Sequence, residues 1–137
     1  MKTALVTGGA SGIGRSIADR LRADGNHVAS IDVTESDTDF SYLVDVTDRA
    51  AIDRTLDAVR GALGPITILV NAAGMTSFRR FTNLTPAEWS KVVDVNLNGV
   101  FHVTQAVLPD MLEAGWGRIV NISVSYTHLT LPTNREV

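Results

Sequence analysis

The fold of this chain is decided close to its N-terminus, where residues 4–14 read ALVTGGASGIG. The apolar run that opens this stretch is typical of a strand buried in a parallel sheet, and a cluster of glycines ends it. Apolar residues then recur at helical spacing from Ile13 to Leu21, and Gly25 marks the end of that pattern. The stretch therefore predicts a strand, a glycine-rich turn and a helix in direct succession.

The remainder of the chain repeats this alternation of strand and helix. Apolar runs predict further strands at residues 27–32, 42–44, 66–70 and 118–122. Helical spacing follows Asp48 as far as Leu63, and a longer helix is predicted from Pro86 to about Ala114. Successive β-α-β units are right-handed and give a parallel sheet that is covered on both faces. We therefore expect an α/β fold, a doubly wound parallel Rossmann sheet of strand order 3-2-1-4-5 that stops before a sixth strand.

The helix boundaries have local sequence signals. Asp48 is a candidate N-cap, and Gly64 ends the helix that follows it. Thr85 and Glu88 have the spacing of a capping box, with a proline at the first helical position between them. Residues 33–44 are too few and too polar for a crossover helix, so we expect a single turn or loop there.

The glycine-rich turn predicts a dinucleotide-binding site. Gly8, Gly12 and Gly14 lie between a strand and a helix, where a phosphate site needs a tight turn and close approach of the backbone. Asp32 ends the next strand, and a carboxylate there accepts hydrogen bonds from the adenosine ribose and repels a 2′-phosphate. The turn contains no Lys or Arg, and Arg15 on the helix is the nearby cation. We therefore expect NAD as the cofactor, with NADP disfavoured; a flexible loop and a strand-end Asp that begins a turn are the structural alternatives.

Composition excludes several other classes of protein. The chain has 137 residues, no Cys, a net charge of −3 and a pI of about 5.5. The lack of Cys excludes a disulfide framework, and its three His are far apart in the sequence, so no metal site is expected. Arg79-Arg80 is too small a basic patch for a nucleic acid backbone, and no apolar run reaches the about 18 residues of a membrane span. We expect a single-domain cytoplasmic protein that binds neither nucleic acid nor membrane.

A series of sequence motifs runs in order along residues 1–123. They are Thr7-Gly8-x-x-x-Gly12-x-Gly14, Asp45-Val46, Asn71-Ala72-Ala73-Gly74, Asn96 within Val95–Gly99, and Arg118–Ser123. Together they resemble the classical short-chain dehydrogenase/reductase family. The resemblance implies an oxidoreductase that transfers a hydride between a nicotinamide cofactor and a ketone or secondary alcohol. The branches it favours are the 3-oxoacyl thioester reductases and the cyclic or aliphatic alcohol dehydrogenases.

The resemblance also implies which residues bind the cofactor. It places the side chain of Asp45 near the adenine amino group and the backbone of Val46 along the adenine ring. The segment Asn71–Gly74 would form the floor under the ribose and nicotinamide, with Ala72 where the family often has Asn. Together with the glycine-rich turn, the expected set is Gly8, Ser11, Gly12, Ile13, Gly14, Asp32, Asp45, Val46, Asn71, Ala72, Ala73 and Gly74.

The catalytic residues of the family are matched only in part. In that family a Tyr exchanges a proton with the substrate oxygen, and a Lys four residues later lowers the pKa of the Tyr. A Ser orients the carbonyl group, and an Asn carries a water in the proton relay. Asn96 matches the relay Asn, whereas Ser123 lies one residue before the position of the family's Ser, which Val124 occupies. Tyr126 has Thr130 rather than Lys four residues on, so Asn96 and Ser123 are the only catalytic residues expected here.

The end of the chain, residues 124–137, departs from the family's pattern. Residues 127–137 have no sustained strand or helix period, and residues 124–133 resemble translated sequencing-adapter read-through. We expect residues 1–123 to form an incomplete NAD(P)-binding domain and residues 124–137 to be a non-native, unstructured tail. The chain would then be an inactive fragment of a homodimeric or homotetrameric enzyme that acts on a small ketone, alcohol or acyl thioester.

A second interpretation remains open. If the tail is native, the chain is a non-catalytic dinucleotide-binding or regulatory protein on the same fold, because a fold alone does not determine function. A serine hydrolase has less support, since the sequence contains no Gly-x-Ser-x-Gly motif. A Tyr-x-x-x-Lys motif beyond Ser123 in an independent copy of the gene would decide for the enzyme.

Overall fold

Within residues 1–123, which the computed structural model describes, five parallel strands form one central sheet. They are β1 (Thr3–Thr7), β2 (His27–Asp32), β3 (Ser41–Leu43), β4 (Ile66–Asn71) and β5 (Arg118–Asn121). Their order is β3-β2-β1-β4-β5, and each neighbouring pair is parallel. The strand order predicted from the sequence is confirmed, and each strand boundary lies within one residue of its predicted position.

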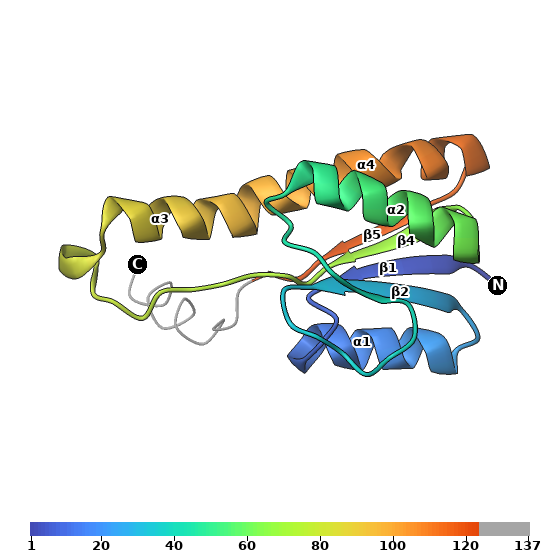
Figure 1. The fold of residues 1–137 in the computed structure, drawn as a ribbon, viewed down its shortest axis with the longest axis horizontal. Coiled ribbons are helices and arrows are strands. Elements are labelled where there is room, and N and C mark those ends of the chain that lie inside the picture. Colours follow the sequence, from blue (N-terminus) through green and yellow to red (C-terminus); the bar gives the residue numbers. More distant parts are fainter. Residues whose placement is uncertain (124–137) are drawn as a thin grey trace, which may run out of the picture.

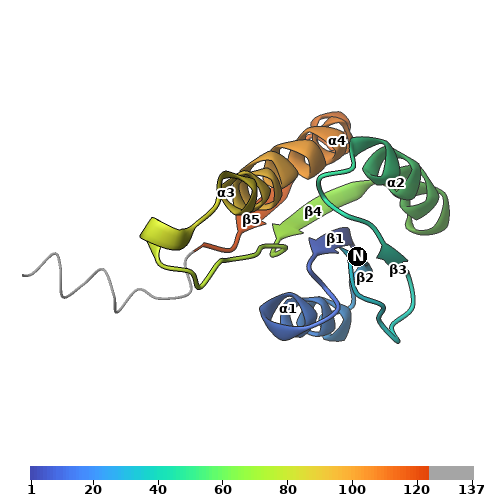
Figure 2. The same cartoon turned by 60° about the vertical axis from the view of Figure 1, so that its left-hand side comes forward.

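Helices cover both faces of the sheet (Figures 1 and 2). α1 (Gly12–Ala23) lies on one face, whereas α2 (Arg49–Leu63) and α4 (Gly99–Ala114) lie side by side on the other. The connection from β2 to β3 contains no helix, as predicted from its length and polarity. The predicted doubly wound α/β architecture is therefore confirmed.

Side chains of β1 alternate between two apolar cores, as expected for a strand that is covered on both faces. Leu5 packs in the core under α2 and α4, together with Ile52. Ala4 and Val6 belong to the other core, which lies under α1. All of β1 is buried, and this enclosure fixes the position of Thr7, from which the glycine-rich turn leaves the sheet.

The predicted helix boundaries are also confirmed. Asp48 is the N-cap of α2, and its carboxylate accepts a hydrogen bond from Ala51 N at 3.1 Å. Thr85 and Glu88 make both hydrogen bonds of a capping box at the start of α3 (Pro86–Val93). Gly115 ends α4 with a φ of 65°, in the left-handed region. Each of these contacts lies within about one turn of the chain, so local sequence is sufficient to predict it.

The long helix predicted from Pro86 onward is not a regular α-helix throughout. A π-helical segment, η2 (Asp94–Asn98), joins α3 to α4, and a short 3-10 turn, η1 (Phe81–Asn83), precedes α3. A π-helical turn has wider hydrogen bonding than an α-helical turn and is frequent at functional sites. η2 contains Asn96, so the irregularity coincides with a predicted site residue.

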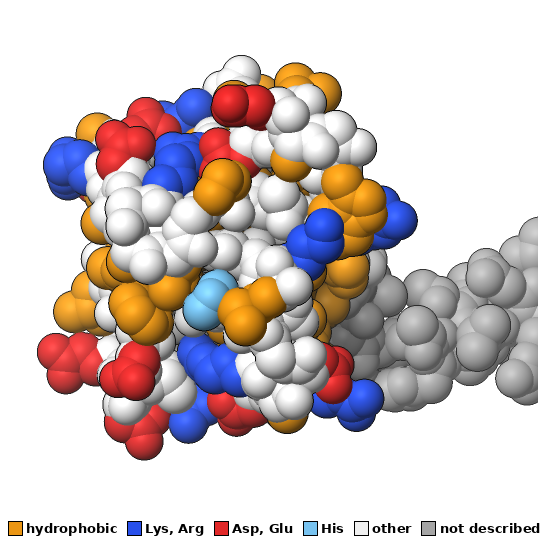
Figure 3. Space-filling model, turned by 90° about the vertical axis from the view of Figure 1, so that its right-hand side faces the viewer, with side chains coloured by type: hydrophobic (Ala, Val, Ile, Leu, Met, Phe, Trp, Pro, Cys, Tyr) orange, Lys and Arg blue, Asp and Glu red, His pale blue; other side chains and the backbone are white. Residues whose placement is uncertain are grey.

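Figure 3 shows the edge of the sheet that is formed by the amino ends of its strands, where the N-terminus lies. Acidic and basic side chains are interspersed over this face. At this edge, Lys2 Nζ and Arg118 Cζ lie 4.0 and 4.7 Å from the ring centre of Trp116. Within the described residues, no helix has both the length and the apolar character needed to cross a membrane.

Candidate functional site

A cleft of about 700 Å³ lies where the strands end. Its walls come from the residues that follow the strands, from the start of α1, and from α3 and η2. The predicted cofactor-binding residues that line it are Gly8, Ser11, Ile13, Gly14, Asp32, Asp45, Val46, Ala72, Ala73 and Gly74. Ligands of open α/β sheets bind at this edge, outside the carboxyl ends of the strands. Segments that are distant in the sequence thus meet in one cavity.

The glycine-rich turn has a backbone that side chains would obstruct. A Cβ on Gly14 would overlap the carbonyl oxygen of Gly8, and a Cβ on Gly8 would lie 2.8 Å from Ala73 N. Gly12 has a φ of 58°, and a Cβ there would meet no atom within 4 Å. Gly8 and Gly14 are therefore required by close backbone packing, whereas Gly12 leaves open space beside the start of α1.

The N-terminus of α1 is suited to an anion. Ser11 is the N-cap, but its side chain makes no capping hydrogen bond within the described structure, and the first turn contains no acidic residue. The first backbone N–H groups of a helix have no partner inside the helix, and the helix dipole places partial positive charge there. These features fit the pyrophosphate of a dinucleotide.

Thr7 connects the glycine-rich turn to the segment after β4. Its buried hydroxyl oxygen accepts hydrogen bonds from Ala72 N at 3.1 Å and from Ala73 N at 2.9 Å. Thr7 belongs to the glycine-rich motif, but the motif alone predicted no separate role for its side chain. The structure shows that it positions the floor of the cleft, and the only sequence signal for this role is its place in the motif.

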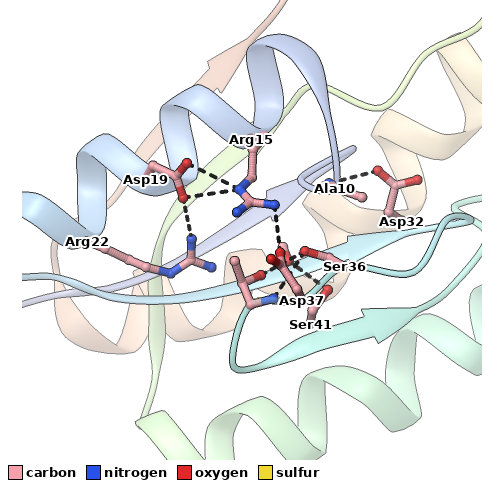
Figure 4. A network of polar contacts seen from close by, with 10 residues as sticks. Ala10, Arg15, Asp19, Arg22, Asp32, Ser36, Asp37 and Ser41 are labelled. Carbon is pink, nitrogen blue, oxygen red and sulfur yellow. Dashed lines mark hydrogen bonds and ion pairs between the residues drawn. The ribbon is translucent and has the colours of Figure 1, made fainter.

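Two carboxylates lie at the ends of β2 and β3. Asp32 accepts a hydrogen bond from Ala10 N at 3.0 Å (Figure 4). It also accepts one from Thr34 N, at 3.0 Å. Asp45 Oδ1 accepts from the backbone N–H and the hydroxyl of Thr47, at 2.9 and 2.8 Å. Both carboxylates are therefore held by local hydrogen bonds at the border of the cleft. Asp32 also begins a turn, which is the structural role that the sequence left open beside the cofactor role.

Asn71 and Gly12 are the predicted cofactor-binding residues that do not line this cleft. The side chain of Asn71 is buried, and its Nδ2 donates hydrogen bonds to Thr104 Oγ1 at 3.2 Å and to Asn121 Oδ1 at 2.8 Å. The amide group thereby links the end of β4 to α4 and β5. The side-chain contacts of Asn71 therefore lie inside the fold, whereas residues 72–74 form the wall of the cleft.

Asn96 binds the loop that follows β4. Its Oδ1 accepts a hydrogen bond from Met75 N at 2.9 Å, and its Nδ2 donates to Met75 O at 2.7 Å. This two-way pairing holds the loop against η2, next to Gly74. Ser123 is exposed and follows Ile122, which lines the cleft. Val124, Tyr126 and Thr130, together with the rest of the predicted tail, lie outside the described residues.

Some residues of the cleft were not predicted from the sequence. They are Ile31, Val33, Val44, Met75, Lys91, Val95 and Ile122. Most of them are apolar residues next to predicted ones in the sequence. Their position at the end of a strand is the sequence feature that could have predicted them. Lys91 comes instead from α3, and among the described residues that line the cleft it is the only basic one.

The parallel sheet, the glycine-rich turn and the cleft at the strand ends define a Rossmann-type α/β protein. A model of the short chain dehydrogenase family matches residues 2–135, and this chain belongs to that family. The predicted family is thus confirmed, and the match runs beyond Ser123, where the recognised motifs stop.

Relatives of known activity agree with the family. The chain is 42% identical to the acetoacetyl-CoA reductase of Allochromatium vinosum, over 89% of this chain and 56% of that protein. It is 39% identical to the 2-dehydro-3-deoxy-L-rhamnonate dehydrogenase (NAD(+)) of Sphingomonas sp., over 89% of this chain and 53% of that protein. The ligand-free structure of Thermoplasma acidophilum aldohexose dehydrogenase has a TM-score of 0.84 at 31% identity, over 89% of this chain and 49% of that one. The chain therefore spans about half the length of these relatives, which are oxidoreductases.

Proposed function

We propose that this chain is the cofactor-binding part of an oxidoreductase that transfers a hydride between NAD and a ketone or secondary alcohol. The observation that carries the proposal is the cleft, because it gathers the glycine-rich turn, Asp32 and Asp45 around one cavity. The preference for NAD over NADP is supported by the position of Asp32 at the end of β2, where its charge opposes a 2′-phosphate. The relative from Sphingomonas, whose name specifies NAD(+), adds support.

In this proposal each wall of the cleft has its own task. The first turn of α1 holds the pyrophosphate, and Asp32 accepts hydrogen bonds from the ribose hydroxyls. Asp45 and Val46 bind the adenine, and the segment 71–74 supports the ribose and the nicotinamide. When bound, the nicotinamide supplies the hydride acceptor or donor. Asn96 and Ser123 are the proposed residues on the side of the substrate.

The substrate is proposed to be a 3-oxoacyl thioester or a cyclic or aliphatic alcohol or ketone. Similarity to an acetoacetyl-CoA reductase supports the first class, and similarity to sugar and sugar-acid dehydrogenases supports the second. Large apolar side chains are exposed along α4, including Phe101, Leu108 and Leu112. They support the proposal that the full-length protein is a homodimer or homotetramer, which we place in the cytoplasm.

The first test is cofactor binding by the purified 137-residue chain. Titration calorimetry with NAD⁺ and NADP⁺ should show tighter binding of NAD⁺. Asp32→Ala should narrow the difference, because it removes the charge that opposes the 2′-phosphate. Tighter binding of NADP⁺ by the unaltered chain would contradict the proposed role of Asp32.

The second test is activity. We propose that this chain does not catalyse the reaction, because neither Tyr42 nor Tyr126 has a Lys four residues later. Oxidation of NADH should remain at background with acetoacetyl-CoA and with cyclic ketones. Ketone-dependent oxidation above background would show that other residues supply the proton. A longer product of the same gene that binds NAD⁺ but lacks activity would favour the alternative, a non-catalytic dinucleotide-binding protein.

A further inference from the structure

Arg15, the cation nearest to the glycine-rich turn in the sequence, is engaged by two acidic residues (Figure 4). Its Nη1 donates a hydrogen bond to Asp37 Oδ1 at 3.0 Å, and its Nε lies 3.2 and 3.3 Å from the two carboxylate oxygens of Asp19. Asp19 is on α1, one turn beyond Arg15, whereas Asp37 is in the loop that follows Asp32. The Arg15–Asp37 ion pair therefore ties the loop after β2 to the helix after the glycine-rich turn.

The side chain of Arg15 is close enough to the cleft to reach a bound ligand when it is not held elsewhere. Arg15 N donates a hydrogen bond to Ser11 O at 3.1 Å, so Arg15 lies one helical turn from Ser11, a residue that lines the cleft. One turn of an α-helix rises by about 5.4 Å, and residues four apart share a face. Helical side chains also lean toward the N-terminus of their helix. A released Arg15 would therefore extend back toward Ser11 and the cleft.

The ion pairs occupy the donors that Arg15 would use for a phosphate. An arginine recognises phosphate best when two of its N–H groups donate in parallel. In this structure Nε points to Asp19 and Nη1 points to Asp37. These hydrogen bonds, with that to Asp37 as the largest cause, raise the pKa of Arg15 above its ordinary value. Asp19 is shared with Arg22, at 3.1 Å, whereas Asp37 has Arg15 as its only ion-pair partner among the described residues.

We propose that Asp37 is a specificity-determining residue for the cofactor, because it holds Arg15 in an ion pair and keeps this guanidinium from a 2′-phosphate near the end of β2. The inference rests on the proposed function and deepens it. Asp32 repels a 2′-phosphate directly through its charge, whereas Asp37 acts indirectly, by holding the Arg15 guanidinium that would otherwise bind the phosphate. The side chain of Asp37 is 84% exposed, so the pair is a solvent-screened one and its effect on affinity is modest.

The test compares two probes that differ only in the 2′-phosphate, ADP-ribose and 2′-phospho-ADP-ribose. Their dissociation constants are measured by calorimetry for the unaltered chain and for Asp37→Asn, which keeps the size of the side chain. Asp37→Asn should bind 2′-phospho-ADP-ribose about 2- to 5-fold more tightly, the range for one exposed ion pair, with ADP-ribose affinity unchanged. The control is Asp24→Asn, which breaks another exposed ion pair, with Arg20 at 3.1 Å, at the C-terminal end of α1. The control should change neither affinity.

The Arg15→Met background separates the ion pair from simple repulsion by Asp37. In that background Asp37→Asn should give no gain, because no guanidinium remains to be released. A gain of equal size in both backgrounds, or no gain in either, would overturn the inference while ADP-ribose binding keeps the proposed function intact. If the unaltered chain binds neither probe, the proposed function fails, and the role of Asp37 fails with it.

Discussion

Replacing Thr7 by Val should destabilise the protein and weaken cofactor binding together. Valine has nearly the shape of threonine, so the buried volume is kept while the hydroxyl acceptor is lost. Two backbone N–H groups, of Ala72 and Ala73, then lose their partner at the end of β4. Both donors are partly buried at the wall of the cleft, and a fully buried donor left without a partner costs about 1–3 kcal/mol. For the pair we expect a loss of about 2–4 kcal/mol in the free energy of unfolding, a large part of the about 5–15 kcal/mol typical of a domain.

The assay is urea unfolding followed by circular dichroism, combined with titration of ADP-ribose. Thr7→Val should lower the midpoint without changing the slope, and the affinity for ADP-ribose should fall about tenfold as the floor of the cleft shifts, equivalent to about 1.4 kcal/mol. Thr7→Ser, which keeps the acceptor oxygen, should retain most of the affinity.

The matched control lies at the other end of the same strand. Thr3 is also buried, and its hydroxyl donates a hydrogen bond to Leu63 O at 2.7 Å, far from the cleft. Thr3→Val should cost about 1 kcal/mol, the value of one hydrogen bond, and leave ADP-ribose affinity unchanged. A loss below about 1 kcal/mol for Thr7→Val, or an equal loss of ADP-ribose affinity in Thr3→Val, would refute the positioning role of Thr7.

Three further perturbations address the turn, η2 and the start of α3. Gly14→Ala should destabilise the chain by about 2 kcal/mol or more and abolish ADP-ribose binding, because its Cβ would overlap Gly8 O; unfolding and titration measure both effects. Asn96→Ala should speed amide hydrogen exchange at Met75 and cost about 1 kcal/mol, because it removes both hydrogen bonds to that residue. The backbone N–H of the N-cap residue lowers the pKa of Glu88, so the capping box stabilises α3 above the ordinary Glu pKa of about 4.3. That contribution is lost as the pH falls through the lowered pKa, and the protection factors of the amides at the start of α3, which correct for the intrinsic pH dependence of exchange, should then fall.

The controls for these perturbations come from the same kinds of position. Gly61 lies within α2, where a Cβ would meet no atom within 4 Å, so Gly61→Ala should stabilise by about 0.5–1 kcal/mol. Asn98 is also in η2, and its side chain donates to Asp94 rather than to the loop, so Asn98→Ala should leave exchange at Met75 unchanged. In Glu88→Gln, the protection factors at the start of α3 should lose their dependence on acidic pH. Destabilisation by Gly61→Ala, faster exchange at Met75 in Asn98→Ala, or an unchanged acid response in Glu88→Gln would contradict the respective explanation.

The sequence by itself was enough for the strands, their order and the outer boundaries of the α-helices. The apolar runs, the N-cap Asp48, the capping box at Thr85 and the ending at Gly115 all act within about one turn of the chain. The strand order followed because right-handed crossovers between parallel strands leave few arrangements of alternating strands and helices. The glycine-rich turn was predictable for the same reason, since its glycines, a strand and a helix are adjacent in the sequence.

Side-chain partners across the sheet were decided by the tertiary structure. Thr7 meets Ala73 across 66 residues of chain, and Asn71 meets Asn121 across 50. No local sequence pattern indicates that the hydroxyl of Thr7 supports the floor of the cleft, or that the amide of Asn71 points into the fold. The direction of a strand-end side chain depends on which strand and helix pack beside it, and that is fixed only when the sheet is complete.

The side-chain partners of Asn96, Lys91 and Arg15 could not be predicted from the sequence for the same reason. Sequence placed Asn96 in a helix at a motif position, but the π-helical turn and the pairing with Met75 depend on a loop 21 residues earlier. Lys91 and Arg15 have the sequence signature of ordinary exposed helix residues. Packing alone put Lys91 in the cleft wall and brought Arg15 to Asp37, 22 residues away, because long polar side chains take their partners from whatever segment the fold places within reach.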